Sequence, residues 1–354
     1  MSNVVAFPRL KKRDQLDMRT ALCRGIAETR RPVDDVFWLK ENAELLGMLA
    51  SSGQTLPGEA LRPYQRFYDE IEEKLRFYPQ YYRFFVSMCL DLEDLGMDGC
   101  KGLSLCRWAA AVGLAEAELS DLQRAEARRL LARRGAAKPA AAGRLGARLR
   151  AFIERPSTFA LPNKKAAYEL THIVFYLSEY GTVDPLLSPL AITSLEYLGV
   201  IAFLDQDHDL LAEVCLALCY AGHVPSTIWM DAVAVAHARI TPSPEPALAL
   251  NADGFHAFLV TGWALREARL PAFEADLGHV PLYFRDPGRD ASALRPLSEC
   301  LYSLGALRSS KWTGMRSRVM PYLDPKTRDI LQRAEESTSD FGAFFEQFAR
   351  ASGS

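Results

Sequence analysis

The segment with the clearest chemical potential runs from Tyr168 to Gly181 and contains Glu169 and His172. A spacing of three residues places these two side chains on one face of a helix. In helical bundles this geometry offers a carboxylate and an imidazole to one metal ion. Both residues lie in an otherwise apolar stretch, where an isolated carboxylate is costly unless it is paired or bound to a metal. The pattern therefore predicts either a polar cavity or a structural ion pair.

Two further candidates follow at regular intervals along the chain. Glu213 lies inside an apolar stretch, and Asp209 precedes it by four residues on the same helix face. Acids at positions 207 and 209 could instead serve only the positive end of a helix dipole. His256 comes one interval after Glu213, near the start of the next apolar stretch.

If these stretches are equivalent units, Glu169, His172, Glu213 and His256 face one central cavity. Two imidazoles and two carboxylates suit a divalent metal, and the same groups can act as general acid and base. We therefore take these four residues as catalytic candidates and as candidate ligands of a divalent metal cofactor. His279 lies on a long irregular segment and is a weaker candidate, which a closing loop could deliver over the cavity.

The elements that position these residues are predicted to be helices. Apolar residues recur at spacings of three and four through most of the chain, whereas strict period-two alternation is nearly absent. Gly181 and Gly222 follow two of the periodic runs, where a left-handed helix end favours glycine. The fold class is therefore all-α, with helices around the candidate residues expected over 163–180, 189–204, 208–221, 226–239 and 252–268.

A faint internal repeat connects the candidate helices. The steps between Glu169, Glu213, His256 and Glu299 are 44, 43 and 43 residues. A period of this length accommodates two helices and two turns, so it predicts stacked helix pairs. Such pairs can close into an α/α toroid, in which alternate helices line a central cavity, or continue as an open α-solenoid. We expect the toroid.

The domain organisation is expected to follow one break in the periodicity. Residues 135–143 contain alanine, glycine, proline and lysine but no large apolar side chain, which predicts an exposed linker. The linker separates an N-terminal helical region, 1–134, from a C-terminal helical-repeat region, 144–354, and the two regions are expected to pack as one globule. Irregular stretches at 241–246 and about 270–290 are expected to be loops between helices.

Composition excludes several classes of protein. The 354 residues are 49% hydrophobic and 24% charged, as is typical of a compact globular chain. The net charge of −2 gives no overall attraction to nucleic acid or to an anionic membrane. Residues 124–150 carry nine basic side chains against one acid, but no aromatic residues interleave for base stacking, so nucleic acid is not the expected partner.

The expected location is the cytoplasm. No apolar run approaches the roughly 20 residues that span a bilayer, so no membrane association is expected. The N-terminal sequence does not have the order of charged and apolar residues that a signal peptide requires. Seven cysteines occur without a CxxC pair, which favours reduced thiols over a disulfide framework or a zinc ribbon.

The motif Glu169-Leu-Thr-His172, followed by an apolar-aromatic run, Glu179 and Gly181, resembles a group of poorly characterised helical bacterial proteins. These proteins carry E-L-T-H, an apolar-aromatic run, an acid and glycine. The later sequence from Asp207 to Glu213 is also similar to that group. The resemblance covers about 160–270 and implies a bacterial helical-repeat fold without implying a reaction.

Two functions remain open from the sequence. The first is a bacterial enzyme of unknown reaction, whose active site lies in the central cavity and acts on a small molecule or peptide, with a divalent metal as an option. The alternative is a helical-repeat binding module for a peptide or protein partner. The sequence lacks the P-loop, the dinucleotide-binding fingerprint, HExxH and GxSxG, so nucleotide-dependent and hydrolytic chemistry through those motifs is not expected.

Overall fold

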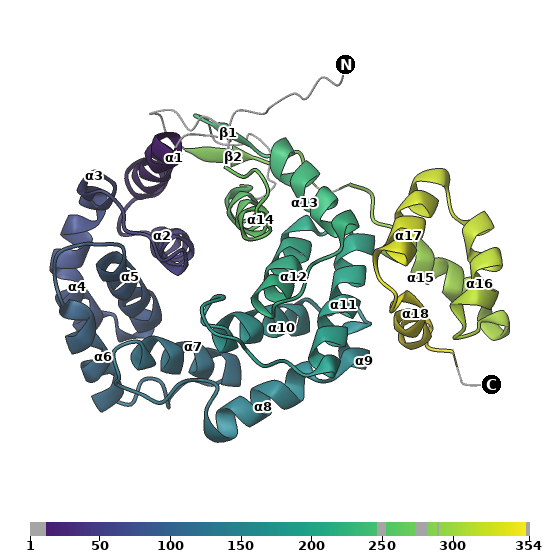
Figure 1. Cartoon of the computed structure of the whole chain (residues 1–354), viewed down its shortest axis with the longest axis horizontal. Coiled ribbons are helices and arrows are strands. Elements are labelled where there is room, and N and C mark those ends of the chain that lie inside the picture. Colours follow the sequence, from purple (N-terminus) through teal and green to yellow (C-terminus); the bar gives the residue numbers. More distant parts are fainter. Residues whose placement is uncertain (1–11, 246–252, 274–281, 289, 352–354) are drawn as a thin grey trace, which may run out of the picture. The chain divides into compact units, whose positions relative to one another are not determined.

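The computed structural model describes residues 12–245, 253–273, 282–288 and 290–351, and helices dominate all of the longer ranges (Figure 1). The predicted all-helical fold class is confirmed. The chain divides into two compact units. The first unit comprises Met1–Cys106, Thr241–Leu250 and Phe273–Arg285, and the second comprises Arg107–Ile240, Asn251–Ala272 and Asp286–Ser354.

The first unit combines helices with a short antiparallel ribbon. Its core lies among α2 (Val36–Ser51), α4 (Gln65–Phe77) and α5 (Tyr82–Asp94). The buried ring of Trp38 in α2 packs against those of Tyr64 and Phe67. A further helix, α6 (Lys101–Ala111), begins in this unit and ends in the second. The elements are α1 (Lys12–Arg24), a π-helix η1 (Gly25–Arg30), α2 (Val36–Ser51), α3 (Gly58–Leu61), η2 (Arg62–Tyr64), α4 (Gln65–Phe77), η3 (Pro79–Tyr81), α5 (Tyr82–Asp94), β1 (Thr241–Ser243) and β2 (Tyr283–Arg285).

A buried ion pair joins three elements of this unit. Arg30, the last residue of the π-helix, donates two hydrogen bonds of 2.7 and 2.9 Å to the carboxylate of Glu41 in α2. Arg31 approaches the same carboxylate at 3.2 Å. Arg30 also donates to the carbonyl of Leu282 at 3.3 Å, and its guanidinium lies 5.6 Å from the ring centre of Phe284 in β2. The pair therefore fastens the π-helix, α2 and the ribbon to one another.

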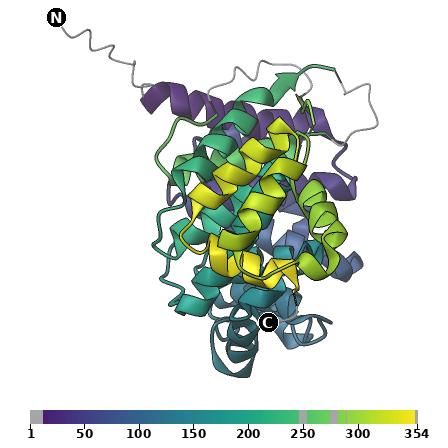
Figure 2. The same cartoon turned by 90° about the vertical axis from the view of Figure 1, so that its right-hand side faces the viewer.

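The second unit contains the remaining helices. The C-terminal helices from α15 onward lie together, coloured yellow-green to yellow in Figures 1 and 2. The elements are α7 (Asp121–Ala132), α8 (Gly143–Ile153), α9 (Pro156–Phe159), α10 (Lys164–Leu177), α11 (Pro189–Leu204), α12 (His208–Tyr220), α13 (Thr227–Arg239), α14 (Phe255–Glu267), α15 (Leu294–Ser303), η4 (Gly305–Leu307), α16 (Trp312–Val319), η5 (Met320–Tyr322), α17 (Pro325–Ser337) and α18 (Phe341–Ala349).

Three alternate helices form a row that carries the candidate residues. Helix α10 packs against α12, and α12 packs against α14, while α11 and α13 pack against the members of this row (Figure 1). Side chains of Asn163, Ser188 and Asp207 accept backbone N–H groups at the starts of α10, α11 and α12. Gly181 and Gly222 follow α10 and α12 with φ of +87° and +74°. The predicted helices and their neighbour relations are therefore confirmed in this part of the chain.

The irregular segments differ in part from expectation. Residues 241–243, which were expected to belong to a loop, form β1 and pair antiparallel with β2, with Thr241 opposite Arg285. The connection 135–143 lies within the second unit between α7 and α8, with Lys138 exposed and Ala140 buried. The expected division into regions 1–134 and 144–354 stays a prediction. His279 and residues 274–281 of the expected 270–290 loop lie outside the described residues.

None of the helices in the residue ranges that the structure describes could span a membrane. Every helix described there is too short or too polar to cross a bilayer.

Candidate functional site

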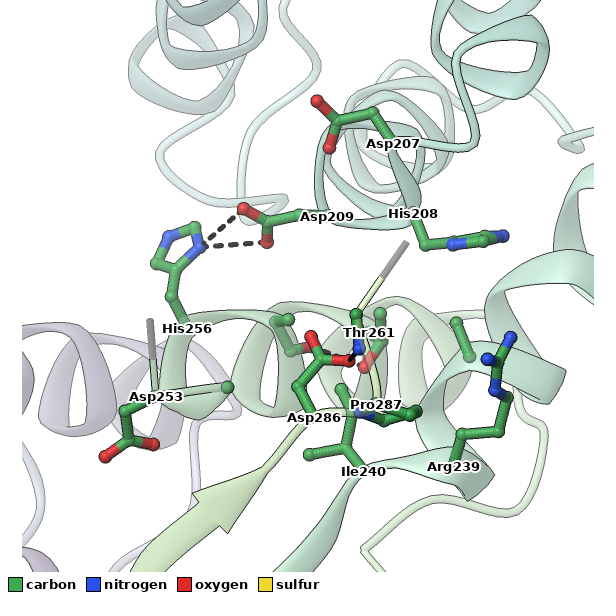
Figure 3. Close-up of a pocket in the computed structure, with 14 residues that line it drawn as sticks. Asp207, His208, Asp209, Arg239, Ile240, Asp253, His256, Thr261, Asp286 and Pro287 are labelled. Atoms are coloured by element: carbon green, nitrogen blue, oxygen red, sulfur yellow. Dashed lines mark hydrogen bonds and ion pairs between the residues drawn. The ribbon is translucent and has the colours of Figure 1, made fainter. Parts of the chain in front are cut away.

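The second unit contains a cavity of about 270 Å³. A single water needs roughly 10–15 Å³ of such volume, so the cavity has room for a small molecule. Its walls come from the start of α12, the end of α13, the start of α14 and the segment that follows β2 (Figure 3). The lining residues are Asp207, His208, Asp209, Ala236, Arg239, Ile240, Asp253, Gly254, His256, Ala257, Thr261, Asp286, Pro287 and Gly288.

A histidine–carboxylate pair occupies one end of this cavity. His256, in the first turn of α14, places Nδ1 at 2.9 and 3.0 Å from the two carboxylate oxygens of Asp209 in the first turn of α12 (Figure 3). Both side chains are 37% exposed. An ionised carboxylate only accepts hydrogen bonds, so Nδ1 carries the proton, and in the neutral imidazole Nε2 is the basic nitrogen.

Short-range hydrogen bonds fix the other three aspartates of the lining. Asp253 accepts the backbone N–H of Phe255 at 3.1 Å. Asp207 accepts the backbone N–H of Leu210 at 3.3 Å and thereby caps α12. Asp286 accepts the backbone N–H of Gly288 at 2.8 Å, and Gly288 has a φ of +87°, a conformation that glycine adopts at no steric cost. The turn after β2 therefore holds the Asp286 carboxylate in a defined place.

The one arginine of the lining is engaged by an acid that does not line the cavity. Arg239, at the end of α13, donates to Asp290 at 2.6 Å. The Arg239 guanidinium beside Asp290 holds the pKa of that carboxyl below its usual range. Lys326 lies 3.5 Å from the same carboxylate. The Arg239 guanidinium is thus held by Asp290, which it shares with Lys326, before any ligand enters.

A second histidine lies behind the cavity wall. His237 Nδ1 lies 2.9 Å from the hydroxyl of Thr261, which itself donates to the carbonyl of Ala257 at 2.5 Å. The His237 ring stacks on Phe258 with ring centres 5.0 Å apart. Burial lowers the pKa of His237 from its ordinary value of 6.5 to about 4. His237 is therefore a neutral imidazole at neutral pH and supports Thr261 in the wall.

The depressed pKa of His237 predicts a loss of stability in mild acid. The unfolded chain binds a proton at this residue below pH 6.5, whereas the native state binds it only near pH 4, so the contribution of His237 to stability is present above pH 6.5 and is lost as the pH falls toward 4. We expect this contribution to be roughly 2–3 kcal/mol. His237→Gln should flatten the corresponding part of a urea-unfolding profile against pH, and the exposed His223→Gln should not. Equal slopes for the wild type and His237→Gln would contradict this reading.

The predicted residues Glu213 and His172 lie next to each other, apart from the cavity lining. Glu213 is buried in α12, and its Oε2 accepts the hydroxyl hydrogen of Thr171 at 2.6 Å. His172 Nδ1 lies 3.8 Å from the same oxygen and 3.0 Å from the carbonyl oxygen of Tyr168, which can only accept a hydrogen bond. The rings of His172 and Tyr168 have centres 3.8 Å apart. This cluster joins α12 to α10.

The hydrogen bond from Thr171 to Glu213 predicts a measurable contribution to stability. Thr171→Val keeps the shape of the side chain but removes the donor to a buried carboxylate, so we expect a loss of about 1.5–3 kcal/mol in the free energy of unfolding. The matched control is Thr193→Val in α11, because the Thr193 hydroxyl donates only to its own helix at the Pro189 carbonyl. Urea unfolding compares the two variants. A cost for Thr171→Val no larger than that of the control would show that the bond contributes little.

The four predicted ligands are not gathered around one point. His256 pairs with Asp209 rather than with Glu213, and Glu169 is half-buried in α10 outside the cavity lining. Asp209 lies one turn before Glu213, so from α12 it reaches α14, whereas Glu213 reaches α10. Across the described ranges, no group of three or more histidine, cysteine, aspartate or glutamate side chains is placed to hold a metal ion. The arrangement therefore gives the metal prediction no support.

The basic segment 124–150 makes ion pairs within the second unit. Four of its arginines approach acidic side chains from the turn before α7, the start of α7 and the residues after α10, which reduces the charge that the segment offers to a polyanion. The pairs are Arg124 and Arg148 with Asp121, Arg128 with Glu116, and Arg129 with Glu179, at 3.0, 2.6, 2.8 and 2.9 Å respectively.

Fold and site together define a helical protein with paired helices in its second unit and a small acidic cavity that contains a histidine–carboxylate pair. The chain belongs to the family described as a domain of unknown function (DUF6902), whose profile matches residues 1–351. This agrees with the poorly characterised family that the sequence resembles. No curated protein and no solved structure matches the chain.

Proposed function

We propose that the protein is an enzyme that uses His256 as a general base in the cavity of the second unit. The observation that carries the proposal is the contact of His256 Nδ1 with both carboxylate oxygens of Asp209 at 2.9 and 3.0 Å, in a cavity wall. Nε2 takes a proton from water or from a substrate hydroxyl, and the oxygen then attacks an electrophilic centre. The imidazolium returns the proton to the leaving group as the bond between that group and the electrophilic centre breaks. The Asp209 carboxylate fixes the ring orientation and stabilises the imidazolium that forms. Hydrolysis and group transfer are the reaction classes that this step serves.

The size of the cavity supports a small-molecule substrate. At about 270 Å³ it lies just below the range of typical ligand pockets and is too small for a folded partner or a long peptide. His256 and Asp209 project from the starts of two helices that pack against each other, so the pair is held by rigid elements.

Among the residues predicted from sequence, His256 keeps a catalytic role in this proposal. Glu213 and His172 have a positioning role, because they join α10 to α12, and α12 carries Asp209. Glu169 receives no role, and no metal is assigned to the site.

The larger setting of the site is also part of the proposal. A row of helices with partners packed against it is the arrangement that an α/α toroid repeats, and we propose toroidal closure in preference to an open solenoid. All seven cysteines are free thiols, which supports a reducing compartment, and we propose a bacterial cytoplasmic protein.

A substrate screen tests the enzymatic proposal. Purified wild-type protein is assayed against small esters, amides and phosphate esters, together with His256→Gln and the exposed His223→Gln as a matched control. We expect turnover that is lost in His256→Gln and kept in His223→Gln. Turnover that survives in His256→Gln would assign the chemistry to other residues.

An exposed apolar segment favours a binding module as the second candidate function. Val183, Leu186 and Leu190 are 53%, 73% and 54% exposed in the short stretch that leads into α11. The Leu186 carbonyl accepts a hydrogen bond from Arg150 at 3.0 Å, which holds the segment in place. Chemical crosslinking in cells compares the wild type with Leu186→Ser. A crosslinked partner that disappears in Leu186→Ser supports this function, and identical crosslinks argue against it.

A further inference from the structure

We infer that the substrate of this cavity is a small organic cation, a primary amine or a guanidinium compound, with Asp286 as the residue that sets the charge specificity. The inference rests on the proposed function in one respect: it takes the cavity that contains the His256–Asp209 pair as the active site.

The lining of the cavity is negatively charged, which favours a cationic ligand. The cavity is lined by four aspartates, one arginine and two histidines. The lining therefore has a formal charge of −3 with both histidines neutral and −1 with both protonated. No protonation state of the histidines makes the lining positive while the aspartates are ionised.

Arg239, the one arginine of the lining, is already engaged by an acid. An arginine in a cavity would ordinarily suggest recognition of a carboxylate or a phosphate. Here the guanidinium donates to Asp290 at 2.6 Å, and Asp290 stands outside the lining. An anionic ligand would have to compete with this pair and would also face the aspartates. The aspartates repel an anion and attract a cation, so an anion is disfavoured and a cation is favoured.

The hydrogen-bonding capacity of Asp286 suits a cationic ligand. A carboxylate has two acceptor oxygens with about four lone-pair sites, and an ammonium group has three donors. Asp286 uses Oδ1 to accept the Gly288 N–H, which holds the carboxylate while leaving it acceptor capacity. Figure 3 shows Asp286 between the His256–Asp209 pair and Arg239, with its carboxylate turned toward Thr261. A cation bound there places the rest of a small molecule beside the proposed base.

The test is a binding experiment with a matched series of probes. The probes are 5-amino-1-pentanol, 1,5-pentanediol and 5-hydroxypentanoate, which share a five-carbon chain and differ in charge. Isothermal titration calorimetry at low and high salt measures their affinities for the wild-type protein, Asp286→Asn and Asp231→Asn. Asp231 is an exposed acid on α13 outside the lining, so its variant controls for a change in net charge alone.

We expect the aminoalcohol to bind the wild type more tightly than the diol and the hydroxyacid not to bind. Asp286→Asn should weaken aminoalcohol binding by about tenfold or more, and salt should weaken it in the wild type. Asp231→Asn should leave this affinity within about twofold, because Asp231 lies outside the lining. Thermal unfolding of Asp286→Asn checks that the variant is folded.

Two results would overturn the inference. One is tighter binding of the hydroxyacid or the diol than of the aminoalcohol, and the other is no aminoalcohol binding at millimolar concentration. Undiminished aminoalcohol binding to Asp286→Asn would remove Asp286 as the specificity residue. These readouts are independent of turnover. Cation binding without turnover leaves the inference standing and counts against the proposed enzyme, whereas turnover of an anionic substrate does the reverse.

Discussion

Replacing His256 with glutamine is expected to lower kcat/KM by about 10²–10⁴-fold for any substrate that the cavity turns over. Glutamine retains a group that can hydrogen-bond to Asp209 but cannot accept and release a proton near neutral pH. The expected loss is in kcat rather than in KM, because the proton transfer takes place in the transition state. Steady-state kinetics of the wild type, His256→Gln and His223→Gln measure this difference.

Asp209→Asn provides the complementary variant. An amide in place of the carboxylate no longer selects the Nδ1–H form of His256, and it cannot stabilise the imidazolium, so we expect a loss of comparable size. The two substitutions should not be additive, because both residues act in one step. If the double variant loses the product of the two single effects, the residues do not form a catalytic pair.

Glu41→Ala is expected to produce the largest loss of stability among the substitutions considered, about 3–5 kcal/mol in the free energy of unfolding. The side chain of Arg30 is 1% exposed, and without Glu41 its charge remains buried without the carboxylate that compensates it. The matched control is Glu44→Ala on the same helix, because Glu44 pairs at 3.7 Å with Lys40, whose side chain is 52% exposed. Exposed pairs of this kind contribute less than about 1 kcal/mol.

A double replacement separates the effect of pairing from the effect of burial. In Arg30→Met with Glu41→Leu the pair is replaced by apolar groups of similar volume, which should restore most of the stability that Glu41→Ala loses. Urea unfolding monitored by tryptophan fluorescence measures all four proteins, because the buried Trp38 lies in the core of the same unit. A loss below about 1 kcal/mol for Glu41→Ala would contradict the buried-pair interpretation.

The helices of the second unit could be predicted from sequence because several local signals agree. The expected spans 189–204 and 208–221 coincide within a residue with Pro189–Leu204 and His208–Tyr220. In both cases apolar periodicity is bounded by a capping side chain and, for the second, by a glycine in left-handed geometry. Such local signals are weak for helix α16, because Trp312–Val319 is short and contains two arginines and a glycine. Its buried face depends on partners that are distant in sequence.

The candidate site could be predicted only in part. His256 was expected to share one central cavity with Glu169, His172 and Glu213, whereas the cavity that His256 lines contains none of these three, and its partner is Asp209. Asp209 and Glu213 are four residues apart and share a helix face, so periodicity cannot tell which of them reaches the next helix. The axial offset between α12 and α14 determines which of the two acids reaches α14, and that offset depends on how the helices pack. Asp286 and Arg239 come from segments that flank the short ribbon, and only the tertiary fold brings them to the cavity.

The most direct test of the general-base assignment is the rate at which diethyl pyrocarbonate modifies each histidine, followed by mass spectrometry at mildly alkaline pH. The reagent attacks the basic nitrogen of a neutral imidazole, so it reports nucleophilic activation without knowledge of the substrate. We expect His256, 37% exposed and supported by Asp209, to react faster than the more exposed His223. Asp209→Asn should slow the reaction of His256 and leave that of His223 unchanged. A His256 that reacts no faster than His223, or whose rate is unaffected by Asp209→Asn, would contradict the assignment of His256 as an activated base.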